Sequence, residues 1–571
     1  MVVKYILIGL LATVSGSASA RTAPDLGPNV LIVGPKDDPA TVQAGIDRIY
    51  SRQQHSEFGP GRYAVLFRSG VYHLDVPVGY YTQVSGLGRS PDDVHIAGNV
   101  HADAALDNNN ATTTFWRGID GVHVTPPDGT MQWAVSQATW LRRVHVSGNL
   151  VLHQKGGWAS GGWLSDAVID GTVNSGSQQQ WLSRNVDWKD WTGANWNMVF
   201  VGTPHAPAGD FPHPPYTRVD DTPVVRERPY LFESKGAWGV FVPAPAKATS
   251  GARWPSGGKG RTVPLAAFHI ARPGTDTART LNAALKAGKN LLLTPGTYDL
   301  TEALHVTRAN TVVLGLGFAT LHPVSGSAAL RIDDVDGVSV AGLLLDAGPV
   351  KSDVLAEIGT TASHRRHAQN PIAFYDVFFR DGGAGPGKVA TNMIVRSNDT
   401  LIDHTWIWRA DHGANVGWTD NVSDTGLLVT GNDVTVYGLF VEHHQKYQVD
   451  WAGERGRVYF YQSELPYDPP EQAAWQSAPG INGWASYKVE DTVRDHQAWG
   501  LGVYSVFTHA NVVQTRAVEA PLTPGVRFHH VTTVSLANRG EITHPVNDAG
   551  EATVAGPQRI DRTLSEYPAG K

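Results

Sequence analysis

The stretch AVLFRSGVYHLDVPVGYYTQVSGLG (64–88) recurs later in the chain as NLLLTPGTYDLTEALHVTRANTVVLGLG (290–317). Both copies have the order strand, G-x-Y-x-L, strand and G-L-G, and a stretch with helical spacing precedes each, at 41–49 and 280–289. Many short β-rich runs separated by Gly, Asn and Asp follow each copy, without crossover helices. This duplication predicts an all-β protein of two tandem parallel β-helices, each with a short N-terminal helix that caps its first coil.

The duplication also sets the expected domain boundaries. We expect a first β-helix at 21–243 and a second at 262–571, which is long enough to complete its own core. The segment between them, 244–261, is rich in Gly, Ser, Pro and Lys and lacks periodicity, so its composition predicts a linker. Residues 1–20 have a lysine, a short apolar run and a final Ala-Ser-Ala, which is typical of a cleaved signal peptide.

Composition narrows the expected partners of the protein. Charged residues make up 17% of the chain, the formal net charge is -7, and there are 18 tryptophans but no cysteine. The absence of a basic patch argues against nucleic acid, and the apolar runs are too short to span a membrane. We therefore expect an exported monomer, secreted or periplasmic, that acts on a neutral polysaccharide whose sugar faces stack on indole rings.

Two glutamates follow short apolar-aromatic strand runs in the second half. Glu442 lies in FVEHHQ and Glu464 in YQSELPYD, 22 positions apart, which is about one coil of a β-solenoid. Adjacent coils would place the two carboxylates side by side, where their repulsion keeps one of them protonated, as a general acid requires. On spacing alone, a pair of solvated loop glutamates explains the pattern equally well.

The first half carries polar clusters at similar intervals. Gln137, Ser160 and Gln178–Gln180 follow one another at steps of roughly one coil. Such a column of amides and hydroxyls could hold a water molecule opposite the carboxylates, as an inverting glycosidase needs. Polar ladders inside β-helices also occur simply because their members satisfy one another's hydrogen bonds.

Seven blocks of the sequence together resemble glycoside hydrolase family 55, the exo-acting β-1,3-glucanases of the laminarinase type. They are SQATWLRRVHVSG (136–148), GWASGGWLSD (157–166), SGSQQQWLSRN (175–185), NWNMVFVG (195–202), WIWRADHGANVGW (406–418), YGLFVEHHQKYQV (437–449) and VYFYQSELPYDPP (458–470). The resemblance covers most of the mature chain in order. It implies two right-handed parallel β-helices of the pectin-lyase-like type and inverting release of glucose from β-1,3-glucan ends, without a metal or cofactor.

The resemblance also implies roles for individual residues. Glu464 corresponds to the general acid and Glu442 to its companion in the sugar site, while Gln137 and Ser160 best match the residues that hold the nucleophilic water. Gln154 and Gln178–Gln180 remain alternatives for the last two roles.

Further residues are candidates for binding the sugar. The aromatic candidates could equally well be packing residues. The Asp411-His412-Gly413 element could equally well be a turn. His443 and His444 could suggest a metal site, but neighbouring residues on a strand point to opposite faces, so no metal is expected. Asp166 and Asp170 read as turn residues. The expected substrate-binding residues are Gln179, Gln180, Asp411, His412, His443, Trp408, Trp451 and Tyr467.

Two other kinds of protein fit part of the pattern. A polysaccharide lyase, or a glucanase of a different linkage, could use the same fold, although no acidic cluster with an attendant Lys or Arg stands out as a lyase site. A non-catalytic glycan-binding solenoid would need the aromatic residues but not the paired glutamates.

Overall fold

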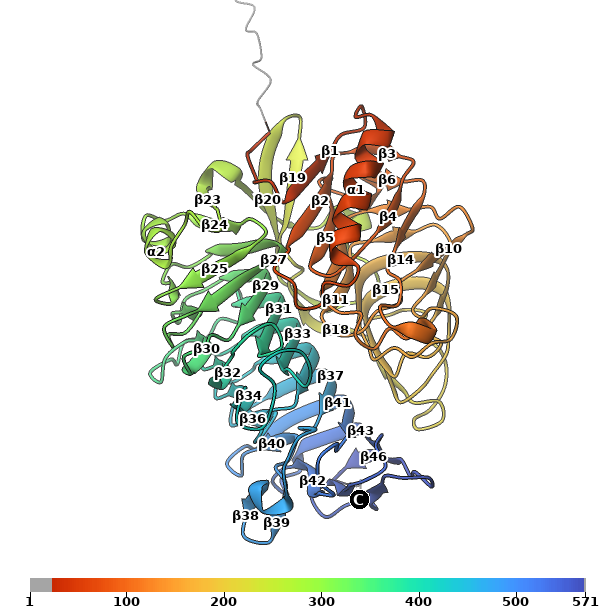
Figure 1. The fold of residues 1–571 in the computed structure, drawn as a ribbon, viewed down its shortest axis with the longest axis vertical. Coiled ribbons are helices and arrows are strands. Elements are labelled where there is room, and N and C mark those ends of the chain that lie inside the picture. The colour runs from red at the N-terminus through yellow and green to blue at the C-terminus, as the bar shows by residue number, and fades with distance from the viewer. Residues whose placement is uncertain (1–22, 569–571) are drawn as a thin grey trace, which may run out of the picture.

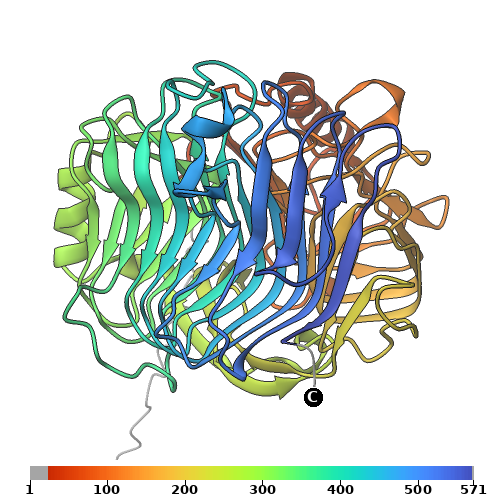
Figure 2. The same ribbon diagram turned by 90° about the horizontal axis from the view of Figure 1, so that it is seen from below.

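A computed structural model of the protein describes residues 23–568, so the expected signal peptide at 1–20 lies outside the described residues. The chain forms two stacks of short strands that lie side by side (Figure 1), coloured red to yellow and green to blue. Seen from below, the strands of each stack follow one another like rungs (Figure 2). Among the described residues, no helix is both long and apolar enough to cross a membrane.

The first solenoid is built around one long parallel ladder that faces the second solenoid. Each strand pairs with the strand one coil later, as Trp140 does with Trp163. The ladder runs through β1 (Val30–Val33), β2 (Tyr63–Phe67), β5 (Thr82–Gly86), β8 (Arg117–Asp120), β11 (Thr139–Arg142), β14 (Trp163–Asn174), β15 (Gln180–Thr192), β16 (Asn197–Val201) and β17 (Tyr216–Val219). Two further walls contain β3 (Gly70–Tyr72), β6 (Val94–Ile96), β9 (His123–Val124) and β12 (His145–Val146), and β4 (Asp75–Pro77), β7 (Asn99–His101), β10 (Thr130–Gln132) and β13 (Asn149–Val151).

The second solenoid repeats this plan with longer strands. Its main wall consists of β23 (Phe268–Ala271), β24 (Asn290–Leu293), β27 (Val312–Pro323), β29 (Ser339–Asp346), β31 (Ala373–Asp381), β33 (Leu401–Arg409), β35 (Thr435–Glu442), β37 (Gly456–Glu464), β41 (Asp495–Ser505) and β43 (Gly525–Ser535), closed by the antiparallel β46 (Arg562–Tyr567). The opposite wall consists of β26 (Leu304–Val306), β28 (Leu330–Ile332), β30 (Ser352–Ile358), β32 (Val389–Val395), β34 (Ser423–Val429), β36 (Val449–Trp451), β40 (Tyr487–Val489), β42 (Val513–Glu519), β44 (Glu541–Val546) and β45 (Thr553–Val554). β25 (Thr297–Leu300) pairs with β27, and β38 (Gln476–Ala478) forms a hairpin with β39 (Ile481–Asn482).

The two copies of the sequence repeat adopt the same local structure. Gly70 and Gly296 have φ angles of 155° and 151°, and a Cβ on either would clash with a proline of the preceding strand segment. The tyrosine two positions later bonds back to the preceding coil in both copies, from Tyr72 to Val33 O and from Tyr298 to Ala271 O. The G-x-Y element therefore turns the chain from one wall of the coil to the next, and only glycine fits the turn.

A helix precedes the repeat in each solenoid, as the sequence predicts. α1 (Pro39–Gln53) is capped by Asp38, whose carboxylate accepts from Thr41 N at 2.9 Å, and α2 (Ala278–Lys286) by a capping box at Thr277. The buried residues of the helices, Val42 and Ile46 in α1 and Leu281 and Leu285 in α2, belong to the cores of their own solenoids. The apolar interior of each terminal coil is thus shielded from water.

The predicted linker at 244–261 is wrong, because this segment is folded. It contains β21 (Ala246–Thr249) and the start of β22 (Gly260–Pro264), which pair antiparallel with β18 (Thr222–Val225) and β20 (Ala237–Pro243); β20 also pairs with β19 (Tyr230–Ser234). The parallel ladders end at β17 and resume at β23. The Gly and Pro residues that suggested a linker form the turns between these antiparallel strands.

The two solenoids pack together through a buried contact that combines rings and charges. Buried rings from the two stacks form one cluster, including Tyr81, Trp116, Trp140, Trp163, Phe318, Phe378, Trp406 and Phe440. Among them, Arg142 of the first solenoid bonds to Asp376 at 2.8 Å and to Asp403 at 2.9 Å in the second. Arg184 also reaches Asp403, at 3.1 Å. Because all these side chains are almost completely buried, each charge needs its partner across the contact.

We therefore expect Arg142→Ala to lower the free energy of unfolding by about 3–5 kcal/mol, because it removes a buried cation from between Asp376 and Asp403. Equilibrium unfolding in urea measures the change. The control is Arg516→Ala, whose partner Asp548 is 78% exposed and can regain water, so that its loss costs less than about 1 kcal/mol. Equal losses in the two variants would contradict the buried ionic contact.

Candidate active site

A cavity of about 300 Å³ lies between the two solenoids. Within the described part of the chain, its lining contains two glutamates but no lysine or arginine. The first solenoid supplies Thr112, Thr113, Phe115, Gln137, Ser160 and Gln179, and the second supplies Trp406, Trp408, Asp411, His412, Glu442, His443, Glu464, Tyr467 and Leu536.

Strand register places the two glutamates next to each other. β35 ends at Glu442 and β37 ends at Glu464, and the parallel pairing of the two strands sets Phe440 opposite Gln462. Two residues further along the same register, Glu464 lies one coil beyond Glu442. The exposed fractions of the residues are 2% for Glu442 and 9% for Glu464. Two carboxyl groups thus share a nearly dry site at the end of two neighbouring strands.

The surroundings of the two carboxyls favour a shared proton. Burial raises the pKa of Glu442 well above its usual range, and the charge of Glu464 raises it further. Burial likewise raises the pKa of Glu464, against the opposing effect of His443. Since each negative charge opposes the other, the pair retains one proton near neutral pH.

A hydrogen-bonded chain connects Glu442 to the first solenoid. Gln137 Nε2 donates to Glu442 Oε1 at 2.9 Å, and Ser160 Oγ donates to Gln137 Oε1 at 2.9 Å. Ser136 lies next to Ser160, and its Oγ accepts a hydrogen bond from Ser160 N at 3.0 Å. The structure therefore brings the two expected water-holding residues into the cavity, but binds them directly to each other and to a carboxylate.

Different donors surround the two carboxyls. Glu442 Oε2 accepts from Trp406 Nε1 at 2.8 Å, so that both its oxygens are bonded to N–H groups of uncharged side chains. Glu464 accepts from the Tyr467 hydroxyl, and Gln462 Nε2 lies 3.5 Å from its other oxygen. The hydrogen bonds to both oxygens of Glu442 stabilise its ionised form and oppose the upward shift that burial gives its pKa.

Two residues that sequence reasoning missed, Glu57 and Phe58, contact the expected residues His412 and Trp408 beside the cavity. Glu57 of the first solenoid bonds to His412 Nε2 at 2.7 Å, and Asp411 bonds to His412 Nδ1 at 3.0 Å. Burial opposes the charge on His412, but the two carboxylates raise its pKa to about 10. Phe58 stacks on Trp408 with ring centroids 6.2 Å apart. These contacts join the two halves of the chain beside the cavity.

The lining includes most of the expected sugar-binding residues. Asp411, His412, His443, Trp408, Tyr467 and Gln179 all line the cavity. His444 points elsewhere, because its Nδ1 bonds to Ser423 Oγ at 2.8 Å in the core. The sequence signal that could have identified Trp406 is its place two residues before Trp408, on the same face of β33.

Three expectations are wrong. Trp451 is completely buried in the core of the second solenoid, where its ring stacks on Tyr487, so it cannot contact a sugar. Gln180 is equally buried, and its amide bonds to Ser160 O behind the cavity wall. Asp166 lies within β14 rather than in a turn, and burial raises its pKa to about 7.

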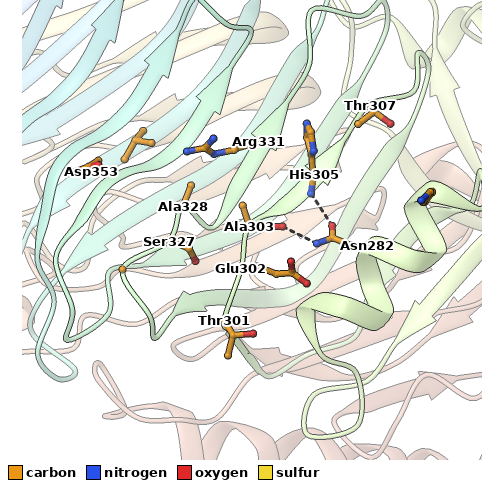
Figure 3. A pocket seen from close by; sticks show the side chains of 13 residues that line it. Asn282, Thr301, Glu302, Ala303, His305, Thr307, Ser327, Ala328, Arg331 and Asp353 are labelled. Atoms are coloured by element: carbon orange, nitrogen blue, oxygen red, sulfur yellow. Dashed lines mark hydrogen bonds between the residues drawn. The ribbon is translucent and has the colours of Figure 1, made fainter.

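A wider cavity of about 670 Å³ lies on the second solenoid beside α2 (Figure 3). There Asn282 connects the helix to β26, because its Nδ2 donates to Ala303 O at 2.8 Å and its Oδ1 accepts from His305 N at 2.9 Å. The lining of this wider cavity, within the described residues, has no Phe, Tyr or Trp and no pair of buried carboxyls. The paired glutamates and aromatic residues expected from the sequence therefore lie in the smaller cavity.

Comparisons with known proteins identify the family of the chain. A sequence model of the LAM55 pectate lyase-like domain matches residues 268–464. An exo-beta-1,3-glucanase from Streptomyces sp. (strain SirexAA-E / ActE) is 46% identical over 550 residues, which cover 95% of this chain and 90% of that enzyme. The chain belongs to glycoside hydrolase family 55. The family resemblance predicted from the seven sequence blocks is thus confirmed.

Solved structures extend the match to the whole fold of this family 55 chain. The structure of sacteLam55A from Streptomyces sp. SirexAA-E is 45% identical, has a TM-score of 0.93, and covers 96% of this chain and 100% of that chain. A second structure shows a variant of the same enzyme, with one glutamate replaced by alanine, in complex with glucose. It also gives a TM-score of 0.93 at 45% identity and covers 97% of this chain and 100% of that chain. The prediction of two tandem β-helices is confirmed.

Proposed function

We propose that this protein is an exo-β-1,3-glucanase that removes glucose from the ends of laminarin-like glucan with inversion at the anomeric carbon. The observation that carries the proposal is the geometry of the cavity. A buried carboxyl pair from one solenoid faces the Gln137–Ser160 pair of the other, in a chain 46% identical to an exo-beta-1,3-glucanase. An inverting glycosidase needs one acid and one activated water, and these two groups supply them.

Glu464 is the proposed general acid. We assign it the proton of the pair because burial raises its pKa, while the two N–H donors on Glu442 oppose the effect of burial on that carboxyl. Glu464 donates that proton to the glycosidic oxygen as the bond to the anomeric carbon breaks. The leaving sugar then departs as a neutral alcohol.

Glu442 and the Gln137–Ser160 pair are proposed to activate the water. Ser160, Gln137 and Glu442 are bonded head to tail, with each donor facing the next acceptor. A water beside Ser160 can therefore release a proton that passes along this chain to Glu442, while its oxygen bonds to the anomeric carbon. Because both oxygens of Glu442 are already occupied by donors, attack by water is favoured over attack by the carboxylate itself.

The walls of the cavity suit the end of a neutral glucan chain. Phe115, Trp406 and Trp408 form an aromatic surface, with the Trp406 and Trp408 ring centroids 4.6 Å apart. Such rings pack against the apolar faces of sugars. The Glu57–His412 contact joins the two solenoids beside the cavity, and we propose that it stops the glucan there, so that the chain enters by its terminus and loses a terminal unit.

The setting of the reaction follows from the rest of the chain. Both halves of the site come from one polypeptide, so a monomer is sufficient for activity. The expected signal peptide at 1–20 would place the enzyme in a periplasm or outside the cell, where polymeric glucan is accessible.

Exchanging each glutamate tests the division of roles. We expect Glu464→Gln to lower kcat on laminarin by about 10²–10⁴-fold, but to retain most activity on a dinitrophenyl β-glucoside, whose leaving group needs no proton. Glu442→Gln should impair both reactions, because activation of the water precedes either. Steady-state kinetics measure the four values, and circular dichroism confirms that both variants fold. Equal losses of Glu464→Gln on the two substrates would exclude it as the acid.

The pH profile tests the protonated state of Glu464. A general acid must keep its proton, so kcat/KM falls as the pH rises through the raised pKa of Glu464. The Tyr467 hydroxyl favours the ionised form of Glu464, so Tyr467→Phe should move this alkaline limb to higher pH. The control is Tyr447→Phe, which changes a tyrosine packed against Trp484 outside the cavity. An alkaline limb unchanged or moved to lower pH in Tyr467→Phe would contradict the assignment.

The stereochemical course separates water attack from carboxylate attack. We expect proton NMR of a laminarin digest to show α-glucose first, followed by slow mutarotation, with glucose as the main early product. Initial β-glucose would show retention and make Glu442 the nucleophile. Unsaturated products absorbing in the ultraviolet would indicate a lyase instead.

A further inference from the structure

Three histidines form a column on a side wall of the first solenoid. His95 in β6, His123 in β9 and His145 in β12 occupy the same register position on successive coils. Their rings are nearly parallel, with centroids 4.4 Å apart for the first pair and 4.1 Å for the second. None of these strands contributes a residue to the catalytic cavity. The column is therefore a separate feature of the protein.

A carboxylate faces the column on one side. Asp92 lies in the short turn η1 (Pro91–Asp93), and its Oδ1 is 2.7 Å from His145 Nδ1 and 3.5 Å from His123 Nδ1. The exposed fractions of the side chains are 49% for Asp92, 17% for His123 and 19% for His145. The three ligand atoms all lie within 4.8 Å of one another. They are fixed by the coils yet accessible from solvent.

The other edge of the two rings is held by a second set of contacts. Ser147 Oγ donates to Asp170 at 3.1 Å and can therefore accept from His123 Nε2, which lies 2.8 Å away. His145 Nε2 lies 3.3 Å from both oxygens of Asp170. Both rings can therefore donate from Nε2, and the Nδ1 atoms of His123 and His145 both face Asp92.

We propose that Asp92, His123 and His145 form a binding site for a divalent transition-metal ion, for which zinc has the matching chemistry. The ion takes the position that Asp92 and the two Nδ1 atoms face, and displaces any proton held there. Two imidazoles, one carboxylate and a water complete four-coordinate zinc. Ligands at about 2.0–2.1 Å from a tetrahedral ion are about 3.3 Å apart, close to the contacts at 2.7 and 3.5 Å. The stacked rings of His123 and His145 must tilt so that both Nδ1 lone pairs point at one ion.

The surroundings indicate a structural role for the ion. Asp170 and Ser147 hold the far nitrogens of both rings, as the partners of metal-bound histidines do. Trp254, from the folded segment between the solenoids, packs beside His145 with centroids 5.9 Å apart. A bound ion would fix the η1 turn to the coils of β9 and β12. It would stabilise the first solenoid without taking part in glucan hydrolysis.

The test uses the full chain without a polyhistidine tag, stripped with EDTA and dialysed. Titration with ZnCl₂ in a calorimeter should give one saturable site per chain. The measured heat should vary with the ionisation enthalpy of the buffer, because binding releases a proton. Saturating zinc should raise the Tm by about 2–5 °C, because it binds only the folded protein. The rate of laminarin hydrolysis should be the same with zinc and with EDTA.

Variants locate the site. Asp92→Asn, His123→Ala and His145→Ala should each abolish the zinc-dependent rise in Tm. His322→Ala is the matched control, because His322 Nδ1 also lies 2.8 Å from a carboxylate, that of Asp299, but no third ligand atom completes a cluster there among residues 23–568. His322→Ala should keep the full response.

Three results would overturn the proposal. One is the absence of saturable zinc binding, and another is binding that survives in His123→Ala and Asp92→Asn. The third is a lower Tm in His145→Ala together with an unchanged response to zinc. That result would assign His145 to a protonated bridge between Asp92 and Asp170, with no ion at the column.

Discussion

The buried contact between the two solenoids is the constraint on which the rest of the structure depends. Arg142 and Arg184 of the first solenoid form ion pairs with carboxylates of the second. The partners, Asp376 and Asp403, are buried away from water. Such partners tolerate little displacement, since a small shift leaves a charge unpaired at low dielectric. The aromatic cluster around them adds packing area. Together these interactions hold the catalytic walls in register.

The catalytic cavity uses the same contact for a different purpose. The side chain of Gln137 crosses from one solenoid to a carboxylate of the other, and Glu57 crosses in the same direction to His412. The ring cluster excludes water from the site, which raises the pKa values of Glu442 and Glu464. The fold therefore raises these pKa values mainly through burial, with no lysine or arginine in the cavity lining of the described residues.

Much of the fold could be predicted from sequence because a solenoid converts sequence spacing directly into space. The spacing of 22 residues between Glu442 and Glu464 equals the pairing register of their strands, so the coil length predicted that they lie on neighbouring coils. Their burial, which excludes the alternative of solvated loop residues, came only from the structure. Gly70 and Gly296 marked equivalent turns for the same reason. The segment 244–261 was mispredicted because glycine and proline are common both in linkers and in tight antiparallel turns.

The site was less predictable where it depends on contacts between the two solenoids. Glu57 lies 355 residues from His412 in sequence, and no periodicity within one solenoid relates them. Trp406 and Trp451 look alike in sequence, but one faces the contact between solenoids and the other faces a core. Which wall a tryptophan occupies depends on packing between coils, and the composition around it does not reveal that choice.

The hydrogen bond between Gln137 and Glu442 spans 305 residues of chain, which has a consequence for biogenesis. During synthesis the first solenoid emerges complete while the carboxylates that it needs are not yet made. Domains generally fold as units in the order of their synthesis. The site, to which the first solenoid contributes Gln137 and Ser160, therefore cannot form until most of the second solenoid has been synthesised. A chain that ends before Glu442 therefore has the amide wall of the cavity without either of its two glutamates.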